Sequence, residues 1–185
     1  MRIIGGAWRG RTLTAPPGLV TRPTSDRLRQ ALFDMLLHAP WGGRDRLEGA
    51  QVLDAFAGTG ALGLETLSRG ASRATFIETS PVALAALRAN IAACRAEKMS
   101  EVLAVDVLGQ PRGVPADVVF LDPPYDRALV PAALSRLRAG GMVAPGTLIV
   151  AETSQEEPSP LADQPGRALA ERAHGKGRLT IWREP

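Results

Sequence analysis

The sequence predicts an α/β fold built on a doubly wound, mostly parallel sheet, and three observations support this prediction. Short apolar runs alternate with segments of helical periodicity from residue 51 onward. These runs are continuously apolar, as expected for strands whose two faces are both covered by helices. The chain has 185 residues, of which 45% are hydrophobic and 22% charged, a composition typical of a globular domain that can bury its own core.

The predicted elements follow in regular order after residue 50. We expect strands at 51–56, 74–78, 102–106, 116–121 and 147–151, and helices from Ala61 to near Gly70, from Ser80-Pro81 onward and over 128–137. Ser80 supplies a helix N-cap and Pro81 a proline at the first helical position. Residues 154–167 read as a polar loop, and 168–184 as an antiparallel hairpin turning at Gly175-Lys176-Gly177.

A separate basic segment precedes this domain. Residues 3–14 are expected to be extended or a hairpin, and a helix is predicted from the apolar positions Leu28, Ala31, Leu32, Met35 and Leu36. Thr24 or Ser25 is its expected N-cap, and Pro40 with Gly42-Gly43 ends it. We therefore divide the chain into an N-terminal extension, 1–46, packed on a main domain, 47–185.

The charge of residues 1–46 indicates a polyanionic partner. This segment holds eight arginines and three aspartates but no lysine, a net charge of +5 within a chain whose total is +3. Arginines on one segment favour nucleic-acid binding over an ordinary solvated face. The expected contacts with nucleic acid are Arg2, Trp8, Arg9, Arg11, Arg22 and Thr24, with packing as the alternative role for Trp8.

The most informative motif is Asp122-Pro123-Pro124-Tyr125, directly after the apolar run 118–121. Neither proline has an N–H, so the turn presents a carboxylate and backbone carbonyls with few competing donors. A flat ring beside several acceptors suits a planar base that carries an amino group. Adenine, cytosine and guanine all meet that description.

Acidic residues close four of the predicted strands: Asp54, Glu78, Asp106 and Asp122. Because ligands of open α/β sheets bind beyond the carboxyl ends of the strands, these side chains are expected at one crevice. Gly58-Thr59-Gly60 lies there too, and residues 58–63 match the dinucleotide-binding pattern G-x-G-x-x-G. A nicotinamide cofactor is the alternative, but hydride transfer gives no role to the Asp-Pro-Pro-Tyr turn.

Together the motifs at 54–60 and 122–125 resemble S-adenosylmethionine-dependent methyltransferases that modify exocyclic amino groups. With Met1–Gly6, Arg9-Gly10-Arg11, 22–33 and 61–71, the chain is similar to the RsmD family, which methylates guanine N2 in 16S ribosomal RNA. The similarity covers roughly 1–150, and 153–177 carry no motif of the family. It implies a Rossmann-like class I methyltransferase fold.

The resemblance also implies roles for the site residues. Asp54, Ala55, Phe56, Gly58, Thr59, Gly60, Glu78 and Asp106 would bind S-adenosylmethionine, and Asp122, Pro123, Pro124 and Tyr125 would form the catalytic turn. Glu78 would accept from the ribose hydroxyls, Asp106 from the adenine amine, and Asp54 would favour the cationic end of the cofactor. Asp122 and the Pro123 carbonyl would accept from guanine N2, with Tyr125 stacked on the base.

The expected partner is 16S ribosomal RNA or an assembly intermediate of the small subunit. Another RNA, or adenine N6 in DNA, is the alternative target, and a non-catalytic RNA-binding factor is a third reading. A single cysteine and the lack of a signal peptide or apolar span favour the cytoplasm. We expect a monomer, and no metal site, because His38 and His174 lack ligand-type neighbours at metal spacing.

Overall fold

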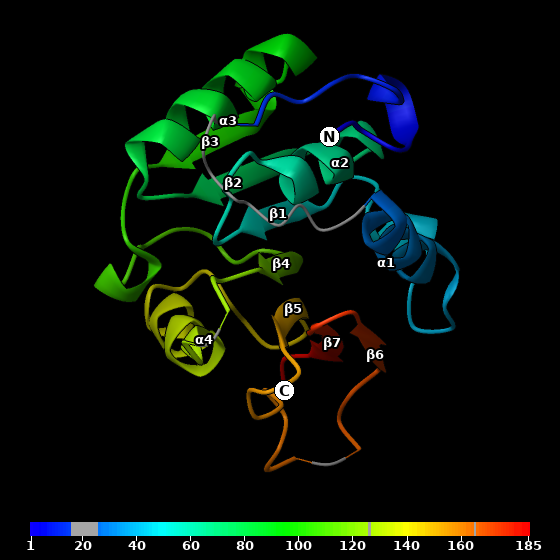
Figure 1. Cartoon of the computed structure of the whole chain (residues 1–185), viewed down its shortest axis with the longest axis vertical. Helices are drawn as coiled ribbons and strands as arrows, with labels where there is room; N and C mark the ends of the chain where they lie inside the picture. Colours follow the sequence, from blue (N-terminus) through cyan, green and yellow to red (C-terminus); the bar gives the residue numbers. More distant parts are fainter. Residues whose placement is uncertain (16–25, 126, 165) are drawn as a thin grey trace.

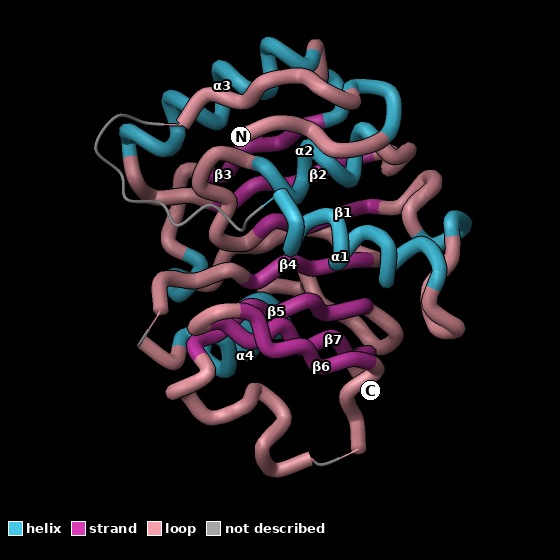
Figure 2. The backbone as a smooth tube through the Cα atoms, turned by 45° about the vertical axis from the view of Figure 1, so that its right-hand side comes forward, coloured by secondary structure: helices cyan, strands magenta, loops and turns pink. Residues whose placement is uncertain are grey.

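The computed structural model describes residues 1–15, 26–125, 127–164 and 166–185. Seven strands form one sheet in the order β3-β2-β1-β4-β5-β7-β6, stacked in Figure 2 from β3 to β6. Their bounds are β1 Gln51–Asp54, β2 Arg73–Ile77, β3 Ser100–Leu103, β4 Val118–Leu121, β5 Leu148–Ser154, β6 Ala170–His174 and β7 Gly177–Arg183. β1 to β5 pair in parallel, and β7 lies antiparallel between β5 and β6. The predicted parallel sheet and C-terminal antiparallel hairpin are both confirmed.

Helices cover both faces of the sheet. The core on one face contains side chains of α1 (Asp26–His38), α2 (Ala61–Ser68) and α3 (Pro81–Cys94), and the other core contains those of α4 (Leu129–Ala139). Figure 1 shows α1 and α4 on opposite sides of the sheet. In β4, Val118 and Phe120 belong to the first core, whereas Val119 and Leu121 belong to the second. This double burial explains the continuous apolar run. No helix in the described part of the chain has the length and apolar character needed to cross a membrane.

The predicted strands differ from the observed ones in their bounds, and the difference affects the site most at β3 and β1. The strand expected at 102–106 is β3, which ends at Leu103. Its only partner among the described strands, β2, ends at Ile77, opposite Leu103, so no hydrogen-bond partners remain for the residues that follow. Asp106 instead begins a 3₁₀ turn, Val107–Gly109, whose Leu108 N–H it caps. β1 ends at Asp54 rather than at residue 56. The predicted caps Thr24 and Ser25 lie outside the described residues.

Residues 1–15, here called the N-terminal arm, form the expected hairpin. Arg2 bridges Thr12, and the Ile3 N–H donates to the Arg11 carbonyl at 2.9 Å. A 3₁₀ turn, Gly6–Trp8, lies between the two sides. The division of the chain at residue 46 stays a prediction.

Buried polar side chains of α2 fasten the arm to the main domain. The fully buried Glu65 carboxylate accepts from the Ile4 and Gly5 N–H groups at 2.7 and 2.8 Å. It also forms an ion pair with Arg69, whose guanidinium lies over the Phe33 ring. Ser68 Oγ accepts from the Trp8 N–H at 2.9 Å and donates to the Gly5 carbonyl at 2.6 Å. One side chain, Glu65, thus holds both the arm and Arg69.

Replacing Glu65 should therefore destabilise the fold. Glu65→Ala leaves two backbone N–H groups and the Arg69 charge without their acceptor, and removing one partner of a buried pair costs about 3–5 kcal/mol. Urea unfolding should show a fall of that order. Glu97→Ala, at an exposed position, should change the unfolding free energy by less than about 0.5 kcal/mol. Similar effects of the two changes would contradict the anchoring role of Glu65.

Candidate active site

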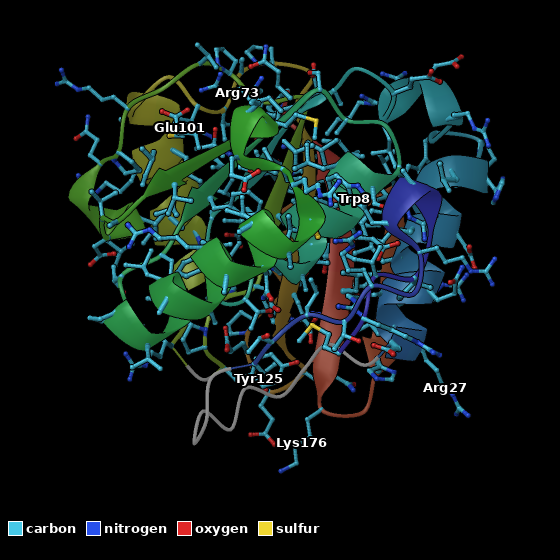
Figure 3. All side chains as sticks on the ribbon, turned by 90° about the horizontal axis from the view of Figure 1, so that it is seen from above. Trp8, Arg27, Arg73, Glu101, Tyr125 and Lys176 are labelled. Carbon is cyan, nitrogen blue, oxygen red and sulfur yellow. The ribbon has the colours of Figure 1, made fainter. Side chains whose placement is uncertain are left out.

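A cavity of about 780 Å³ opens at the carboxyl edge of the parallel strands. Figure 3 shows Tyr125 at this edge, on the opposite side of the molecule from Arg73 and Glu101, which lie at the starts of β2 and β3. The predicted residues that line the cavity are Asp54, Phe56, Gly58, Thr59, Glu78, Asp106, Asp122, Pro123, Pro124 and Tyr125. The expected convergence of strand-end acids on one crevice is thus seen in the geometry, and the volume is that of a small-molecule site.

Glu78 organises the rim of the cavity through backbone hydrogen bonds. Its Oε2 accepts from the Gly58 N–H at 2.9 Å, and its Oε1 accepts from the N–H groups of Thr79 and Ser80, both at 2.7 Å. These donors belong to the loop after β1 and to the segment that leads into α3. One carboxylate therefore fixes the glycine loop relative to the end of β2.

Asp54 lies deeper, at the end of β1. Its side chain is 2% exposed and Oδ2 accepts from the Gly63 N–H at 3.1 Å. Burial, the largest effect, and the negative charge of Glu78 raise the pKa of Asp54, whereas the Gly63 hydrogen bond lowers it. The net result is a shift from 3.8 to about 7. A carboxyl group that titrates near neutral pH is therefore placed behind the glycine loop.

The conformation of the glycine loop depends on packing as well as on the hydrogen bonds of Glu78 and Asp54. Gly60 caps α2 with φ of 78°, and a Cβ there would lie 2.4 Å from Leu87 Cδ1 in α3. Gly60 and Ala55 do not line the cavity, and Ala55 is buried in the core on the α4 side of the sheet. These two predicted cofactor residues therefore support the loop from behind.

The Asp122–Tyr125 turn forms the other side of the cavity, with Asp122 and Tyr125 half-buried and Pro123 buried. The Tyr125 hydroxyl donates to the carboxylate of Glu152, in β5. This contact gives the ring a defined orientation at the cavity edge, so the turn is braced by the neighbouring strand.

Four of the predicted RNA-binding residues lie on the arm, outside the cavity lining: Arg2, Trp8, Arg9 and Arg11. Trp8 is partly buried against the core on the helix-rich face. Arg9 is exposed, whereas Arg11 is exposed but donates to the Ala93 carbonyl at the end of α3, and Arg2 pairs with Asp26 at 3.8 Å. Arg22 and Thr24 lie outside the described residues. The role of these residues in RNA binding stays a prediction.

The cavity lining also includes residues that were not expected in the site, among them Met1, Arg29 and Glu152. Glu152 directly follows the apolar run at 147–151, so the strand-end pattern that singled out Asp122 applied to it too. Arg29 looked like part of a basic surface but is fully buried, where its Nη2 donates to the Arg2 carbonyl and to Asp26. Burial lowers its pKa, against the opposing effect of Asp26 and Glu65.

The strand order, the glycine loop after β1 and the acids at the ends of β1 and β2 define a Rossmann-like class I methyltransferase. The residues present fit its cofactor, S-adenosylmethionine: Glu78 and Asp106 offer acceptors on the cavity wall, and the carboxyl group of Asp54 lines the same cavity. Among the described residues, no group of three metal-ligating side chains is found.

Comparison with known proteins identifies the family. The family model described as "Conserved hypothetical protein 95" matches residues 1–183. The "Ribosomal RNA small subunit methyltransferase D" of Escherichia coli K12 is 42% identical over 162 residues, which cover 86% of this chain and 78% of that protein. The chain belongs to the RsmD family of methyltransferases, and the match extends beyond the 150 residues that the motifs covered.

Solved structures agree with this assignment. The "Putative methyltransferase yhhF" from Escherichia coli superposes with a TM-score of 0.83 at 36% identity, over 99% of this chain and 97% of that one. A Thermus thermophilus 16S rRNA methyltransferase superposes with a TM-score of 0.66 at 21% identity, over 88% of this chain and 43% of that one, and shows a shared fold.

The raised pKa of Asp54 predicts a pH-dependent stability. Between about pH 4 and 7 the folded protein keeps a proton that an unfolded chain has lost, so this contribution falls as the pH rises through that window. From pH 5.5 to 8.0 the loss should be about 2 kcal/mol. Asp54→Asn, which keeps an acceptor for the Gly63 N–H, should lose correspondingly less in urea unfolding at the two pH values. Equal declines would contradict the raised pKa.

Proposed function

We propose that the protein transfers a methyl group from S-adenosylmethionine to the exocyclic N2 amine of a guanine in 16S ribosomal RNA. The observation that carries this proposal is a shared cavity. Asp122–Tyr125, the turn suited to an amino-bearing base, lines the same cavity as Asp54, Glu78 and Asp106, which suit the cofactor. On this proposal, the methyl donor and the accepting base would share one cavity.

The cofactor is S-adenosylmethionine, which supplies a methyl group on a sulfonium sulfur that keeps the bonding electrons when the methyl leaves. The chain's residues would bind the rest of the molecule. Glu78 accepts the ribose hydroxyls, Asp106 accepts from the adenine amine, and Asp54 stabilises the cationic end. The bound positive charge favours the ionised form of Asp54, so binding draws on a group that titrates near pH 7.

The catalytic turn would act by orienting the amine. The Asp122 carboxylate and the Pro123 carbonyl accept the two N2–H bonds, which directs the nitrogen lone pair toward the methyl carbon. A new N–C bond would form as the S–C bond breaks, and the amine would lose one proton to Asp122, which is already hydrogen-bonded to it. Positioning of this kind supplies much of the rate for a weak nucleophile.

Tyr125 would hold the target base in the site. A guanine in folded RNA must leave its stack for N2 to reach the cavity, at a cost of a few kcal/mol. Stacking on an aromatic ring offsets about 1–3 kcal/mol of this cost. Because its hydroxyl is fixed by Glu152, the Tyr125 ring is oriented before the base arrives.

Two similarities support the choice of target. The E. coli relative is named as a methyltransferase of small-subunit ribosomal RNA. The T. thermophilus structure is that of a 16S rRNA N2 G1207 methyltransferase in complex with AdoMet and guanosine. Carried over to this chain, these similarities suggest ribosomal guanine N2, with an amine of another RNA or adenine N6 in DNA as the alternative. A ribosomal substrate would place the protein in the cytoplasm.

The direct test is methyl transfer from labelled S-adenosylmethionine to small-subunit RNA, followed by mapping of the modified base. Asp122→Ala should lower kcat by orders of magnitude, because it removes the acceptor that orients the amine, while cofactor affinity stays within about twofold. The matched control is Asp163→Ala, at an exposed position in the loop after β5.

The outcomes separate the parts of this proposal. Label on adenine would replace guanine as the target, and label on free nucleotides or protein alone would exclude ribosomal RNA. Full activity of Asp122→Ala would exclude its role at the amine. Loss of cofactor binding by the same variant would assign Asp122 to the cofactor rather than to the base.

The arm predicts a salt-dependent RNA contact. Arg9 is exposed on the arm, and its replacement by alanine should lower the slope of log affinity against log salt by about 0.7–0.9, the value for one lost phosphate contact. Arg73 is the control, because it pairs with Glu101 at 3.0 Å on the side of the molecule opposite Tyr125 (Figure 3). An unchanged slope for Arg9→Ala, or an equal change for Arg73→Ala, would remove the arm from the RNA surface.

A further inference from the structure

Two carboxylates lie at neighbouring positions directly after the parallel pairing of β4 with β5 ends. Leu121 in β4 pairs with Ala151 in β5, so the next residues, Asp122 and Glu152, occupy equivalent positions. Both line the large cavity and also a smaller adjoining hollow. Asp122 is assigned above to the base amine, whereas the methyl-transfer chemistry gives Glu152 no role.

Glu152 is held in a defined position by the C-terminal hairpin. Its Oε1 accepts from the Tyr125 hydroxyl, and both groups lie against Gly177, the first residue of β7. A Cβ at Gly177 would lie 2.5 Å from the Tyr125 hydroxyl oxygen and 3.1 Å from Glu152 Oε1. Gly177 does not have a positive φ, so its backbone conformation does not require a glycine. The glycine instead leaves space for the Tyr125 hydroxyl and the Glu152 carboxylate.

The surroundings of this pair suit the edge of a flat ring. Leu28 of α1 and Leu62 of α2 line the smaller hollow together with Asp122 and Glu152. Apolar side chains beside two carboxylates exclude water, which strengthens hydrogen bonds to a bound base. A carboxylate can accept several hydrogen bonds at once, so the bond from Tyr125 is compatible with a further donor from a ligand.

We propose that Glu152 recognises the target base by accepting a hydrogen bond from guanine N1–H, next to the amine held by Asp122. This inference rests on the proposed function and extends it to base selection. Guanine alone among the amino-bearing bases has a ring N–H adjacent to its amine. In adenine and cytosine the ring nitrogen beside the amine carries a lone pair, which Glu152 would repel.

Base selection by Glu152 gives a physical reason for guanine rather than adenine as the target. The half-buried Glu152 carboxylate would face a lone pair instead of a donor and lose a hydrogen bond, and sites built on such hydrogen bonds reject the analogue strongly. The turn at 122–125 accepts an amine from any of the three bases, whereas the added carboxylate accepts only one of them. Glu152 is therefore a specificity-determining residue, and Tyr125 positions it.

The test compares guanine with 2,6-diaminopurine at the position that mapping identifies in a small-subunit RNA fragment. Diaminopurine keeps the amine at C2 but has an unprotonated N1. Wild-type protein should prefer guanine in kcat/KM by about 10- to 100-fold or more. Glu152→Gln offers an amide N–H to the N1 lone pair, so it should lower kcat/KM for guanine and raise it for diaminopurine.

Two further variants separate recognition from a structural role. Glu152→Ala removes the acceptor without adding a donor and should bring the ratio near one without raising the rate on diaminopurine. Glu156→Gln, exposed in the loop after β5, should leave the ratio unchanged. Thermal unfolding and cofactor affinity of each variant show whether the fold is retained.

The possible results are distinct. A change of preference toward diaminopurine in Glu152→Gln, with the smaller change in Glu152→Ala, supports the proposal. Equal losses on both RNAs, or an unchanged ratio in both variants, would overturn it. If wild-type protein methylates neither substrate at the C2 amine, the proposed function fails instead, and the wild-type measurement alone reveals that result.

Discussion

The site depends on one geometric constraint, the common edge at which the parallel strands end. Because β1, β2, β4 and β5 run in the same direction and in register, the residues after their apolar runs meet at one cavity. Each strand needs only a single acidic residue at its end to contribute. Glu78 then adds cohesion, since its backbone hydrogen bonds hold the glycine loop and the start of α3 around the same space. The sheet determines where the acidic residues lie, and local hydrogen bonds fix the conformation of the loops around the cavity.

The N-terminal arm is tied to the same machinery. Asn90, buried in α3, exchanges hydrogen bonds with the backbone of Thr14. It also donates to the Thr59 carbonyl in the glycine loop at 2.9 Å. Glu65 and Ser68 bind the other end of the arm to α2. The segment proposed to contact RNA and the loop proposed to hold the cofactor therefore share a side chain, which makes the arm part of the site's framework.

The sequence predicted those features that depend on local order along the chain. Continuous apolar runs indicated buried strands, and Asp122 was found because a strand and a turn motif adjoin it. Strand-end logic failed where tertiary pairing decides the boundary, as at Asp106, because the length of an edge strand is set by its partner. The same strand-end pattern is present at Glu152, which directly follows the predicted strand at 147–151, but Glu152 was not assigned to the site. Arg29 and Glu65 are different, since nothing in their neighbourhood along the chain shows that a second segment buries them.

The close approach of Gly177 to the Tyr125 hydroxyl makes the C-terminal hairpin part of the surroundings of the site. In the sequence alone, residues 153–177 show no motif of the family, although the family model covers them. In the folded molecule, the start of β7 lies next to the Tyr125 hydroxyl, and the backbone at Gly177 limits the space available to that hydroxyl and to the Glu152 carboxylate. The hairpin is thus a structural neighbour of the Asp122–Tyr125 turn, and Gly177 leaves the space in which the Tyr125 hydroxyl meets Glu152. That space depends on a residue 52 positions beyond Tyr125, whose contribution is the absence of a side chain.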